Sequence, residues 1–332
     1  MALPPPRYLR PQDLRRFQNF QFAARLIVEG FYAGRHRSPY HDASAEFADY
    51  RPYVPGDEIR ALDWRAYART DRDYIKLFRK DTDMRCHVLL DTSRSMAFRG
   101  EPEADPDTDP PPRRNGWRRL APQRKQTAGN KSEEAPLSKF EYAAYLTAAL
   151  GYLMIRQGDR ASLALGADDL QVFLPPGGTM AHLYRLLYTL EQTRPDGPTR
   201  LSTALRALFT VARRKGLLVV LSDFLEAPEP LFAALSMYAQ RGWQILLLQV
   251  LTEAEMNLPD AGRPLRFLDA EGPGMADADP NALRAAYRSE LQAHLDTLET
   301  QSKAHRIHYA RMTTATPYDQ ALERYLTTRS QS

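Results

Sequence analysis

The stretch that decides the fold spans residues 86–96 and reads Cys-His-Val-Leu-Leu-Asp-Thr-Ser-Arg-Ser-Met. Its first five residues form a largely apolar run of strand length, which is typical of a strand buried on both faces of a parallel sheet. Asp91 ends this run and begins the polar pattern Asp-x-Ser-x-Ser. The stretch therefore predicts a central strand whose carboxyl end carries a carboxylate and two hydroxyl groups.

Apolar runs and helical patterns alternate in the chain that follows. Strands are expected at residues 86–90, 161–165, 170–174, 217–221, 243–251 and 306–310, helices at 140–157, 180–192, 201–215, 229–241, 281–304 and 317–327, and a loop-rich hairpin around 253–279. Continuous apolar strands that alternate with helices indicate a mainly parallel sheet covered on both faces. The expected fold class for residues 85–330 is therefore α/β, with a doubly wound, Rossmann-type sheet in three layers.

Two of the expected central strands end at acidic residues. Asp91 ends the first strand, and Asp223 closely follows the strand at 217–221. In doubly wound sheets, ligands bind beyond the carboxyl ends of the strands, at the point where the strand order reverses. Asp91 and Asp223 are thus expected at the ligand-binding end of the sheet.

Oxygen-bearing side chains around Asp91 predict a site for a divalent cation. The carboxylate of Asp91 and the hydroxyls of Ser93 and Ser95 can converge on one point if the turn curls around it. Hard oxygen ligands of this kind suit Mg²⁺. Because such an ion needs further ligands, we also consider Thr199, in a later loop, and Asp223.

This pattern resembles the metal-ion-dependent adhesion site of von Willebrand factor A domains. That family has Asp-x-Ser-x-Ser, a threonine from a later loop and an aspartate at the end of the next central strand, matched here by Asp91, Ser93, Ser95, Thr199 and Asp223. The resemblance implies that both serines bind Mg²⁺ or another divalent cation directly, and that the threonine does so in one state. It implies that both aspartates act mostly through water. One coordination position would stay open for a carboxylate from a protein partner.

The upstream sequence resembles a bacterial family. Residues 46–57 read Glu-Phe-Ala-Asp-Tyr-Arg-Pro-Tyr-Val-Pro-Gly-Asp, and Arg60, Asp63-Trp64 and Ala68-Arg69-Thr70 follow. These residues look like the signature of the domain-of-unknown-function family fifty-eight, whose members carry such an A domain and are typically encoded beside MoxR-type AAA+ ATPases. The resemblance covers most of residues 30–327 and implies such an ATPase as a partner. The chain departs from the family in the length of the loop after Met96 and in lacking the transmembrane anchors of some members.

Residues 1–84 are expected to form an N-terminal extension that carries this signature at about 46–70. The signature interleaves acidic, basic and aromatic side chains, which can form a dense cluster of ion pairs and stacked rings. Such a cluster fits two roles. It is either a docking surface for a partner or an internal clamp that fastens the extension to the A domain.

Residues 97–137 break the alternating pattern. They contain seven prolines, an acidic half and a basic half, and almost no apolar periodicity. Such a segment cannot bury enough apolar surface to offset the entropy lost on ordering, so we expect a disordered insertion. We also consider the hypothesis that a carboxylate from its acidic half, at 101–109, occupies the open metal position when no partner is bound.

The composition sets limits on partners and compartment. The chain has 45 Lys and Arg against 41 Asp and Glu, and a net charge of +4 does not require a nucleic-acid partner. The single cysteine, Cys86, excludes an intrachain disulfide and fits a reducing compartment. No apolar run approaches the ~18 residues of a membrane helix, and no secretory signal is found. We therefore expect a cytoplasmic protein without a membrane partner.

Several enzyme motifs are missing from the sequence. No phosphate-binding Gly-x-x-x-x-Gly-Lys-Ser/Thr, Gly-x-Gly-x-x-Gly or Gly-x-Ser-x-Gly is found, and Ser93 stands where a haloacid-dehalogenase pattern needs a second aspartate. His305 and His308 are expected on opposite faces of one strand, which argues against a zinc site. The expected function is a non-enzymatic, metal-dependent adaptor. The alternative is a metal-dependent hydrolase or phosphoryl-transfer enzyme that uses the same pocket at Asp91 and Asp223.

Overall fold

A computed structural model of the chain describes residues 7–9, 45–52, 74–80, 84–100, 136–258, 265–272 and 274–330. Its strands are β1 (Ala45–Pro52), β2 (Tyr74–Lys80), β3 (Arg85–Asp91), β4 (Arg160–Gly166), β5 (Leu170–Gly177), β6 (Leu217–Ser222), β7 (Gln244–Leu251), β8 (Leu265–Leu268), β9 (Met275–Ala278) and β10 (His308–Thr313). Its helices are η2 (Arg94–Ala97), α3 (Lys139–Arg156), α4 (Met180–Gln192), α5 (Leu201–Val211), α6 (Pro228–Gln240), α7 (Glu253–Asn257), α8 (Pro280–Ala304) and α9 (Tyr318–Ser330).

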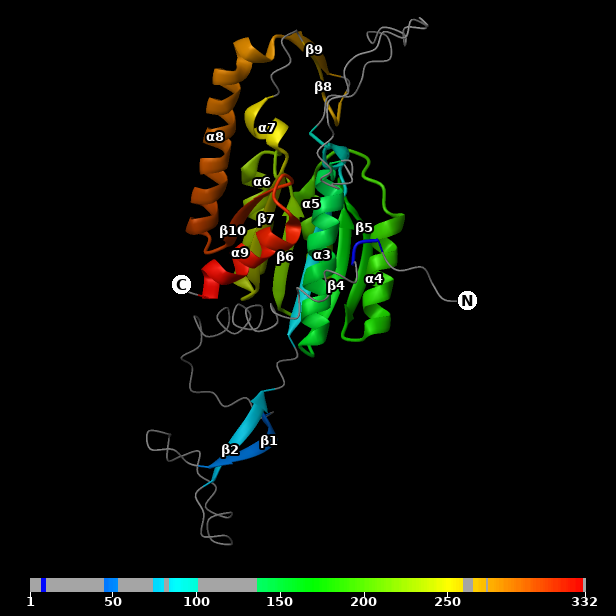
Figure 1. The fold of residues 1–332 in the computed structure, drawn as a ribbon, viewed down its shortest axis with the longest axis vertical. Helices are drawn as coiled ribbons and strands as arrows, with labels where there is room; N and C mark the ends of the chain where they lie inside the picture. Colours follow the sequence, from blue (N-terminus) through cyan, green and yellow to red (C-terminus); the bar gives the residue numbers. More distant parts are fainter. Residues whose placement is uncertain are drawn as a thin grey trace, which may run out of the picture.

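The central sheet has six strands in the order β10-β7-β6-β3-β4-β5. Neighbouring strands are parallel except β4 and β5, which pair as an antiparallel hairpin. The chain builds one half of the sheet from β3 outward to β5 and then crosses to β6 and builds the other half (Figure 1). The strand order therefore reverses between β3 and β6. The prediction of a doubly wound, mainly parallel sheet is confirmed.

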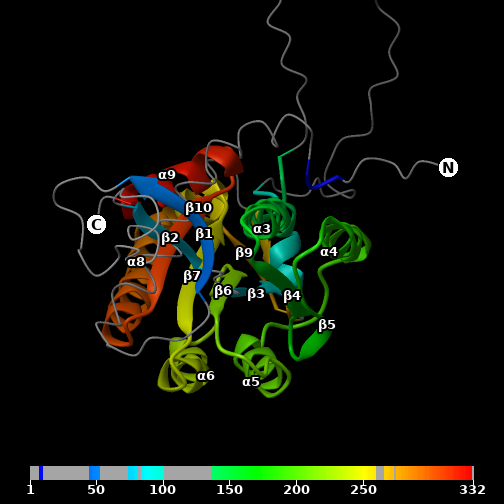
Figure 2. The ribbon, with the colours of Figure 1, turned by 90° about the horizontal axis from the view of Figure 1, so that it is seen from below.

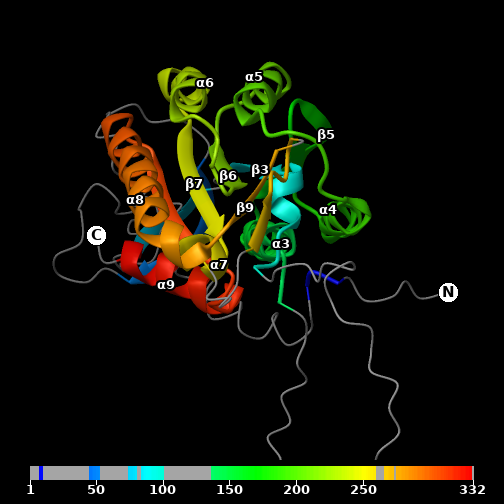
Figure 3. The same ribbon diagram turned by 90° about the horizontal axis from the view of Figure 1, so that it is seen from above.

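Each face of the sheet has its own hydrophobic core. Side chains of β3 alternate between the two faces, so Val88 and Leu90 belong to one core and Leu89 to the other. Helices α3, α4 and α9 cover the first face, and α5 and α6, with part of α8, cover the second (Figures 2 and 3). The three-layer arrangement follows from strands that are apolar on both sides.

The start of α3 is fixed by a capping box. The Ser138 hydroxyl accepts the backbone N–H of Glu141, and the Glu141 carboxylate accepts the N–H of Ser138. Arg7 and Arg99 also pair with this carboxylate, at 2.6 and 2.8 Å. Three separate parts of the chain thus hold the first turn of α3 in place, and Lys139 is the first residue of that turn.

Strand β5 and helix α5 end at other residues than predicted. Strand β5 continues through Pro175 and Pro176, which is compatible with its place at the edge of the sheet because one side of an edge strand needs no N–H donors. Helix α5 ends at Val211, four residues earlier than expected, and residues 212–215 lead into β6. A Cβ on Gly216 would lie 2.2 Å from the carbonyl oxygen of Arg85, so the approach to β3 requires a glycine there.

The expected strand at 306–310 begins later, at His308. His305 instead caps the C-terminal end of α8, and its ring stacks on Phe232 with centroids 5.5 Å apart. Arg306 has a φ of 57°, in the left-handed region that commonly ends helices. The placement of His305 and His308 on opposite faces of one strand is therefore wrong.

Parts of the N-terminal extension and of the insertion lie outside the described residues. Strands β1 and β2 pair as an antiparallel hairpin that includes the beginning of the upstream signature. Residues 53–70 of that signature and 101–135 of the insertion are not described. The boundary at residue 84 and the disorder of the insertion therefore stay predictions. Within the described ranges, every helix is too short or too polar to cross a lipid bilayer.

A buried histidine makes the sheet sensitive to acid. His87 on β3 is 1 % exposed, and its Nδ1 lies 2.9 Å from the hydroxyl of Ser162 on β4. Its ring centroid is 4.9 Å from that of Trp243. Burial, reinforced by the charge of Arg85, lowers the pKa of His87 from 6.5 to about 4. The histidine is therefore neutral in the folded protein at neutral pH.

We predict that the free energy of unfolding falls as the pH drops from about 6.5 towards 4, because the unfolded chain then binds a proton that folded His87 does not. At about pH 5 the expected loss from this residue is about 2 kcal/mol relative to about pH 7.5. Urea unfolding at both pH values measures it. The control is His87→Leu/Ser162→Ala, which removes both hydrogen-bonding partners and should reduce the pH dependence by that amount. An equal pH dependence in both proteins would contradict the prediction.

Candidate functional site

Asp91 links the ends of the two strands that flank the reversal of strand order. Its side chain is fully buried, and both of its oxygens accept hydrogen bonds. Oδ1 accepts the backbone N–H of Ser93 at 2.8 Å, and Oδ2 accepts the hydroxyl of Ser222 at 2.6 Å. Since Ser222 ends β6, the carboxylate joins β3 to its neighbour. Asp91 is therefore a carboxyl group held in a fixed position behind the Asp-x-Ser-x-Ser loop.

The hydroxyls of Ser93 and Ser95 converge. Their Oγ atoms lie 3.1 Å apart, Ser93 is buried, and Ser95 is half-buried in the short helix η2. Adjacent ligand oxygens on an octahedral Mg²⁺, with bonds of about 2.1 Å, are about 3 Å apart. The two serines therefore have the separation that two neighbouring ligands of one ion require.

The loop that carries Thr199 lies against the Asp-x-Ser-x-Ser loop. The N–H of Arg94 donates to the carbonyl of Gly197 at 2.9 Å, and the N–H of Asp196 donates to the carbonyl of Thr92 at 2.8 Å. The side chains of Arg94 and Asp196 form an exposed ion pair at 2.6 Å. These contacts bring together two segments that the sequence predicts to form one site.

Asp223 is paired with a buried lysine. Its Oδ2 lies 2.7 Å from Nζ of Lys139, and both side chains are 1 % exposed. The same ammonium pairs with Glu255 on α7. Burial alone lowers the pKa of a lysine, but the carboxylates of Asp223 and Glu255 hold the pKa of Lys139 above its ordinary value. Lys139 is thus a fixed cation beside Asp223.

The backbone after Asp223 is strained. Phe224 has a φ of 49°, which is unfavourable for a residue with a Cβ, and its side chain is buried. The Asp223 carbonyl accepts a hydrogen bond from Nε2 of Gln249 at 2.7 Å, and its Oδ1 accepts the N–H of Leu225 at 3.3 Å. These contacts fix the direction of the Asp223 carboxylate at the end of β6.

Thr199 is covered by a carboxylate from a distant segment. Both its hydroxyl and its N–H donate to Glu271, and the N–H to Oε2 distance is 2.8 Å. Glu271 lies at the tip of the hairpin formed by β8 and β9. Figure 3 shows this hairpin over the end of the sheet from which η2 emerges.

Negative charge is crowded around these residues. Burial, followed by the charge of Asp223, raises the pKa of Asp91 to about 7. Burial, then the charge of Asp91 and, less strongly, those of Asp223 and Glu271, raises the pKa of Glu226 to about 7. Oε1 of Glu226 is buried and accepts no hydrogen bond within the described part of the chain. An orphaned carboxylate oxygen in such a cluster fits a place where a cation binds.

The donors at this site are oxygens. In the portion of the chain that the structure describes, no group of three or more His, Cys, Asp or Glu side chains is arranged to hold a metal ion. An ion here would therefore depend on the hydroxyls of Ser93, Ser95 and Thr199, which suits Mg²⁺. The structure joins Asp91, Ser93 and Ser95 directly and brings the Thr199 loop to them. In the described contacts Thr199 faces Glu271 and Asp223 faces Lys139.

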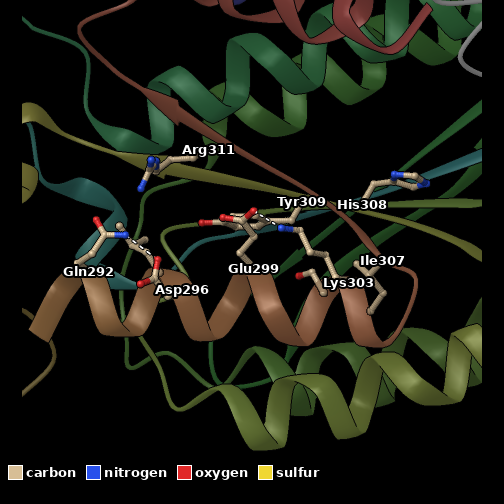
Figure 4. A pocket seen from close by; sticks show the side chains of 10 residues that line it. Gln292, Asp296, Glu299, Lys303, Ile307, His308, Tyr309 and Arg311 are labelled. Carbon is tan, nitrogen blue, oxygen red and sulfur yellow. Dashed lines mark hydrogen bonds and ion pairs between the residues drawn. The ribbon is translucent and has the colours of Figure 1, made fainter. Parts of the chain in front are cut away.

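A separate pocket lies between α8 and β10 (Figure 4). Its lining includes the ion pair of Glu299 and Lys303, at 2.6 Å, and Tyr309. The hydroxyl of Tyr309 donates to Gln249, which in turn donates to the Asp223 carbonyl. Hydrogen bonds through the buried Gln249 thus connect one lining residue of the pocket to the backbone of Asp223.

Sequence analysis missed five residues of the site, namely Lys139, Ser222, Glu226, Glu255 and Glu271. The position of Lys139 in the sequence could have indicated its role. A cation in the first turn of a helix is unfavourable because it opposes the helix macrodipole, and a nearby acidic side chain would compensate for this. Ser222 directly precedes the predicted Asp223. Glu255 carries a local signal only for its role in a Thr-x-x-Glu capping box with Thr252, and Glu226 lies three residues after Asp223. Glu271 carries no local signal, because its partner Thr199 is 72 residues away.

Comparison with known families identifies the chain. Residues 49–107 and 125–297 match the model of the family described as "Protein of unknown function DUF58". The chain belongs to this family. The family resemblance of the upstream signature is therefore confirmed, and the match includes the segments that carry all five predicted oxygen donors.

Relatives of this DUF58 protein include two from mycobacteria. "Uncharacterized protein Mb1516" of Mycobacterium bovis is 24 % identical over 301 residues, which cover 87 % of this chain and 83 % of that protein. "Uncharacterized protein Rv1480" of Mycobacterium tuberculosis matches with the same identity and coverage.

Similar solved structures include BatB from Bacteroides thetaiotaomicron, with 16 % identity and a TM-score of 0.42 over 75 % of this chain and 100 % of that one. The SpRpn10 VWA domain has 9 % identity and a TM-score of 0.39 over 73 % of this chain and 94 % of that one. An aerotolerance-related membrane protein from Bacteroides fragilis has 16 % identity and a TM-score of 0.40, with 74 % and 99 % covered.

We predict that Lys139→Met destabilises this DUF58 protein by about 3–5 kcal/mol, because Asp223 and Glu255 lose the cation buried between them. Chemical denaturation measures the change. The matched control is Lys303→Met, which breaks an exposed pair with Glu299 on α8 and should cost less than about 1 kcal/mol. Equal losses in the two variants would show that the buried lysine has no special role.

Proposed function

We propose that this DUF58 protein is a non-enzymatic, metal-dependent adaptor that binds other proteins at the carboxyl ends of β3 and β6. The observation that carries the proposal is the convergence of the Ser93 and Ser95 hydroxyls, 3.1 Å apart, in front of the buried Asp91. The site lies where the strand order of the sheet reverses, which is the usual ligand-binding position in this class of fold.

The residues have distinct roles in this proposal. Ser93 and Ser95 would hold Mg²⁺, or another divalent cation, through their hydroxyls, and Thr199 would join them in one state. Asp91 would balance the charge of the ion without binding it directly, because its two oxygens already accept hydrogen bonds from Ser93 and Ser222. Asp223 would act in the same indirect way, since Lys139 pairs with one of its oxygens.

The charge of these ligands favours an anionic partner. Hydroxyl ligands are neutral, and Lys139 partly neutralises the carboxylates around the site. A bound divalent cation would therefore keep positive charge toward solvent and offer a position for a partner's carboxylate. Binding of this kind requires no nucleophile and no general base.

The family resemblance supports a choice of partner. Because members of this family are typically encoded beside MoxR-type AAA+ ATPases, we propose such an ATPase as the partner, with the adaptor assisting the assembly or activation of other complexes. The chemistry of the site supports a less specific statement, namely that the partner contributes an acidic side chain.

We predict that Mg²⁺ binds the purified protein and that Ser93→Ala/Ser95→Ala abolishes this binding, because the variant loses both direct ligands. Isothermal titration calorimetry with MgCl₂ measures it. The matched control is Ser236→Ala/Thr297→Ala, which removes two hydroxyls that donate to carbonyls of their own helices, α6 and α8, and belong to no residue of the site. Equal binding by wild type and the site variant would contradict the proposal.

A second experiment separates an adaptor from an enzyme. A co-expressed MoxR-type ATPase should be captured by wild type in Mg²⁺ and lost both with chelator and in Ser93→Ala/Ser95→Ala. Phosphatase and esterase substrates should not be turned over. Turnover that disappears in Asp91→Ala would instead support the metal-dependent hydrolase or phosphoryl-transfer alternative.

A further inference from the structure

The contact between Thr199 and Glu271 is the starting point. Each oxygen of the Glu271 carboxylate accepts one hydrogen bond from Thr199, Oε2 from the N–H at 2.8 Å and Oε1 from the hydroxyl. Such two-point recognition of a carboxylate fixes its orientation as well as its position. The two residues are 72 positions apart in the sequence, so tertiary structure creates the contact.

The contact adds a carboxylate to a part of the molecule that is already acidic. Glu271 adds a carboxylate to a region that already contains Asp91, Asp223 and Glu226, and its charge acts on Glu226. The ammonium of Lys139 is committed to Asp223 and Glu255. A cation bound among these acidic residues would stabilise the carboxylate of Glu271 beside them.

The same contact is compatible with a bound metal. The Thr199 hydroxyl gives its hydrogen to Glu271 and keeps lone pairs that can bind a cation. Neighbouring ligand oxygens around Mg²⁺ are about 3 Å apart, close to ordinary hydrogen-bond length. The Glu271 carboxylate is therefore adjacent to a hydroxyl that the proposed ion would bind.

Hydrogen bonds at the tip of the β8–β9 hairpin hold Glu271 in position. Oδ1 of Asp269 accepts the N–H of Glu271 at 2.9 Å, and the N–H of Asp269 donates to the carbonyl of Gly274 at 2.8 Å. A Cβ at Gly272 would lie 2.5 Å from the Asp269 carboxylate, so glycine leaves room for this carboxylate at the tip. The tip is a closed turn with Glu271 on it.

The hairpin is not part of the hydrophobic core. The side chains of Leu268 and Met275, which pair on either side of the tip, are 63 % and 70 % exposed. Arg266 and Asp277 form an exposed ion pair across the hairpin at 3.0 Å. A segment with so little buried apolar surface can leave the site without unfolding the domain.

We infer that Glu271 is an internal ligand of this site: its carboxylate occupies the position beside Thr199 that an acidic side chain of a partner would take, and the β8–β9 hairpin must move away before a partner binds. The inference rests on the metal-dependent binding proposed above. It differs from the sequence-based hypothesis that a carboxylate from residues 101–109 fills the open metal position. Those residues lie outside the described part of the chain.

The test uses the full chain with Mn²⁺ as the probe, because Mn²⁺ accepts the same oxygen ligands as Mg²⁺ and relaxes the protons of water bound to it. If Glu271 fills a coordination position, Glu271→Gln should increase the relaxation enhancement of bound Mn²⁺ by admitting a water. Glu271→Ala should give the same increase. The matched control, Asp277→Asn, removes one charge from the same hairpin and should behave as wild type.

Acetate then serves as a carboxylate probe. It should displace the additional water in Glu271→Gln at a concentration about tenfold lower than it needs in wild type, because the internal competitor is gone. Equal acetate dependence and equal relaxation in wild type, Glu271→Gln and Glu271→Ala, with Mn²⁺ bound to all three, would overturn this inference alone. Failure of wild type to bind Mn²⁺ would overturn the proposed function and this inference with it. Thermal unfolding of each variant confirms that the domain is folded.

Discussion

Two carboxylates, Asp91 and Asp223, are buried at the ends of adjacent strands, and the surrounding structure is arranged to make this tolerable. Buried charges of one sign repel and are costly to remove from water. Ser222 and the N–H of Ser93 hydrogen-bond to one carboxylate, and Lys139 forms an ion pair with the other. The capping box that starts α3 has the further effect of fixing the residue that carries this ammonium.

The candidate site is assembled from segments that are distant along the chain. The Asp-x-Ser-x-Ser loop, the Thr199 loop, the end of β6 and the tip of the β8–β9 hairpin meet at one end of the sheet. The first three are held by backbone hydrogen bonds and by strand pairing, so their arrangement is rigid. The hairpin contributes through Glu271 and has little buried surface of its own. If the proposed cation binds to these fixed loops, a carboxylate on a separate hairpin would let binding of a partner be switched.

The agreement between expected and observed elements has a physical cause. Strands such as β6 and β7 are buried on both faces, and their continuous apolar runs identify them without knowledge of their neighbours. Predictions were wrong where a neighbour decides the boundary. Strand β5 tolerates Pro175 and Pro176 because it is an edge strand, and α5 ends early because the chain has to bring Gly216 against β3.

The sequence by itself determined the fold class and the two strand ends at Asp91 and Asp223, because both depend on local pattern and on the general rule for doubly wound sheets. The set of oxygen donors for a metal ion stays a prediction. Tertiary structure decided what those donors face. The partners of Asp223 and Thr199, which are Lys139 and Glu271, lie 84 and 72 residues away in the chain. Contacts over such separations depend on how helices and hairpins pack on the sheet, and no local pattern of residues encodes that packing.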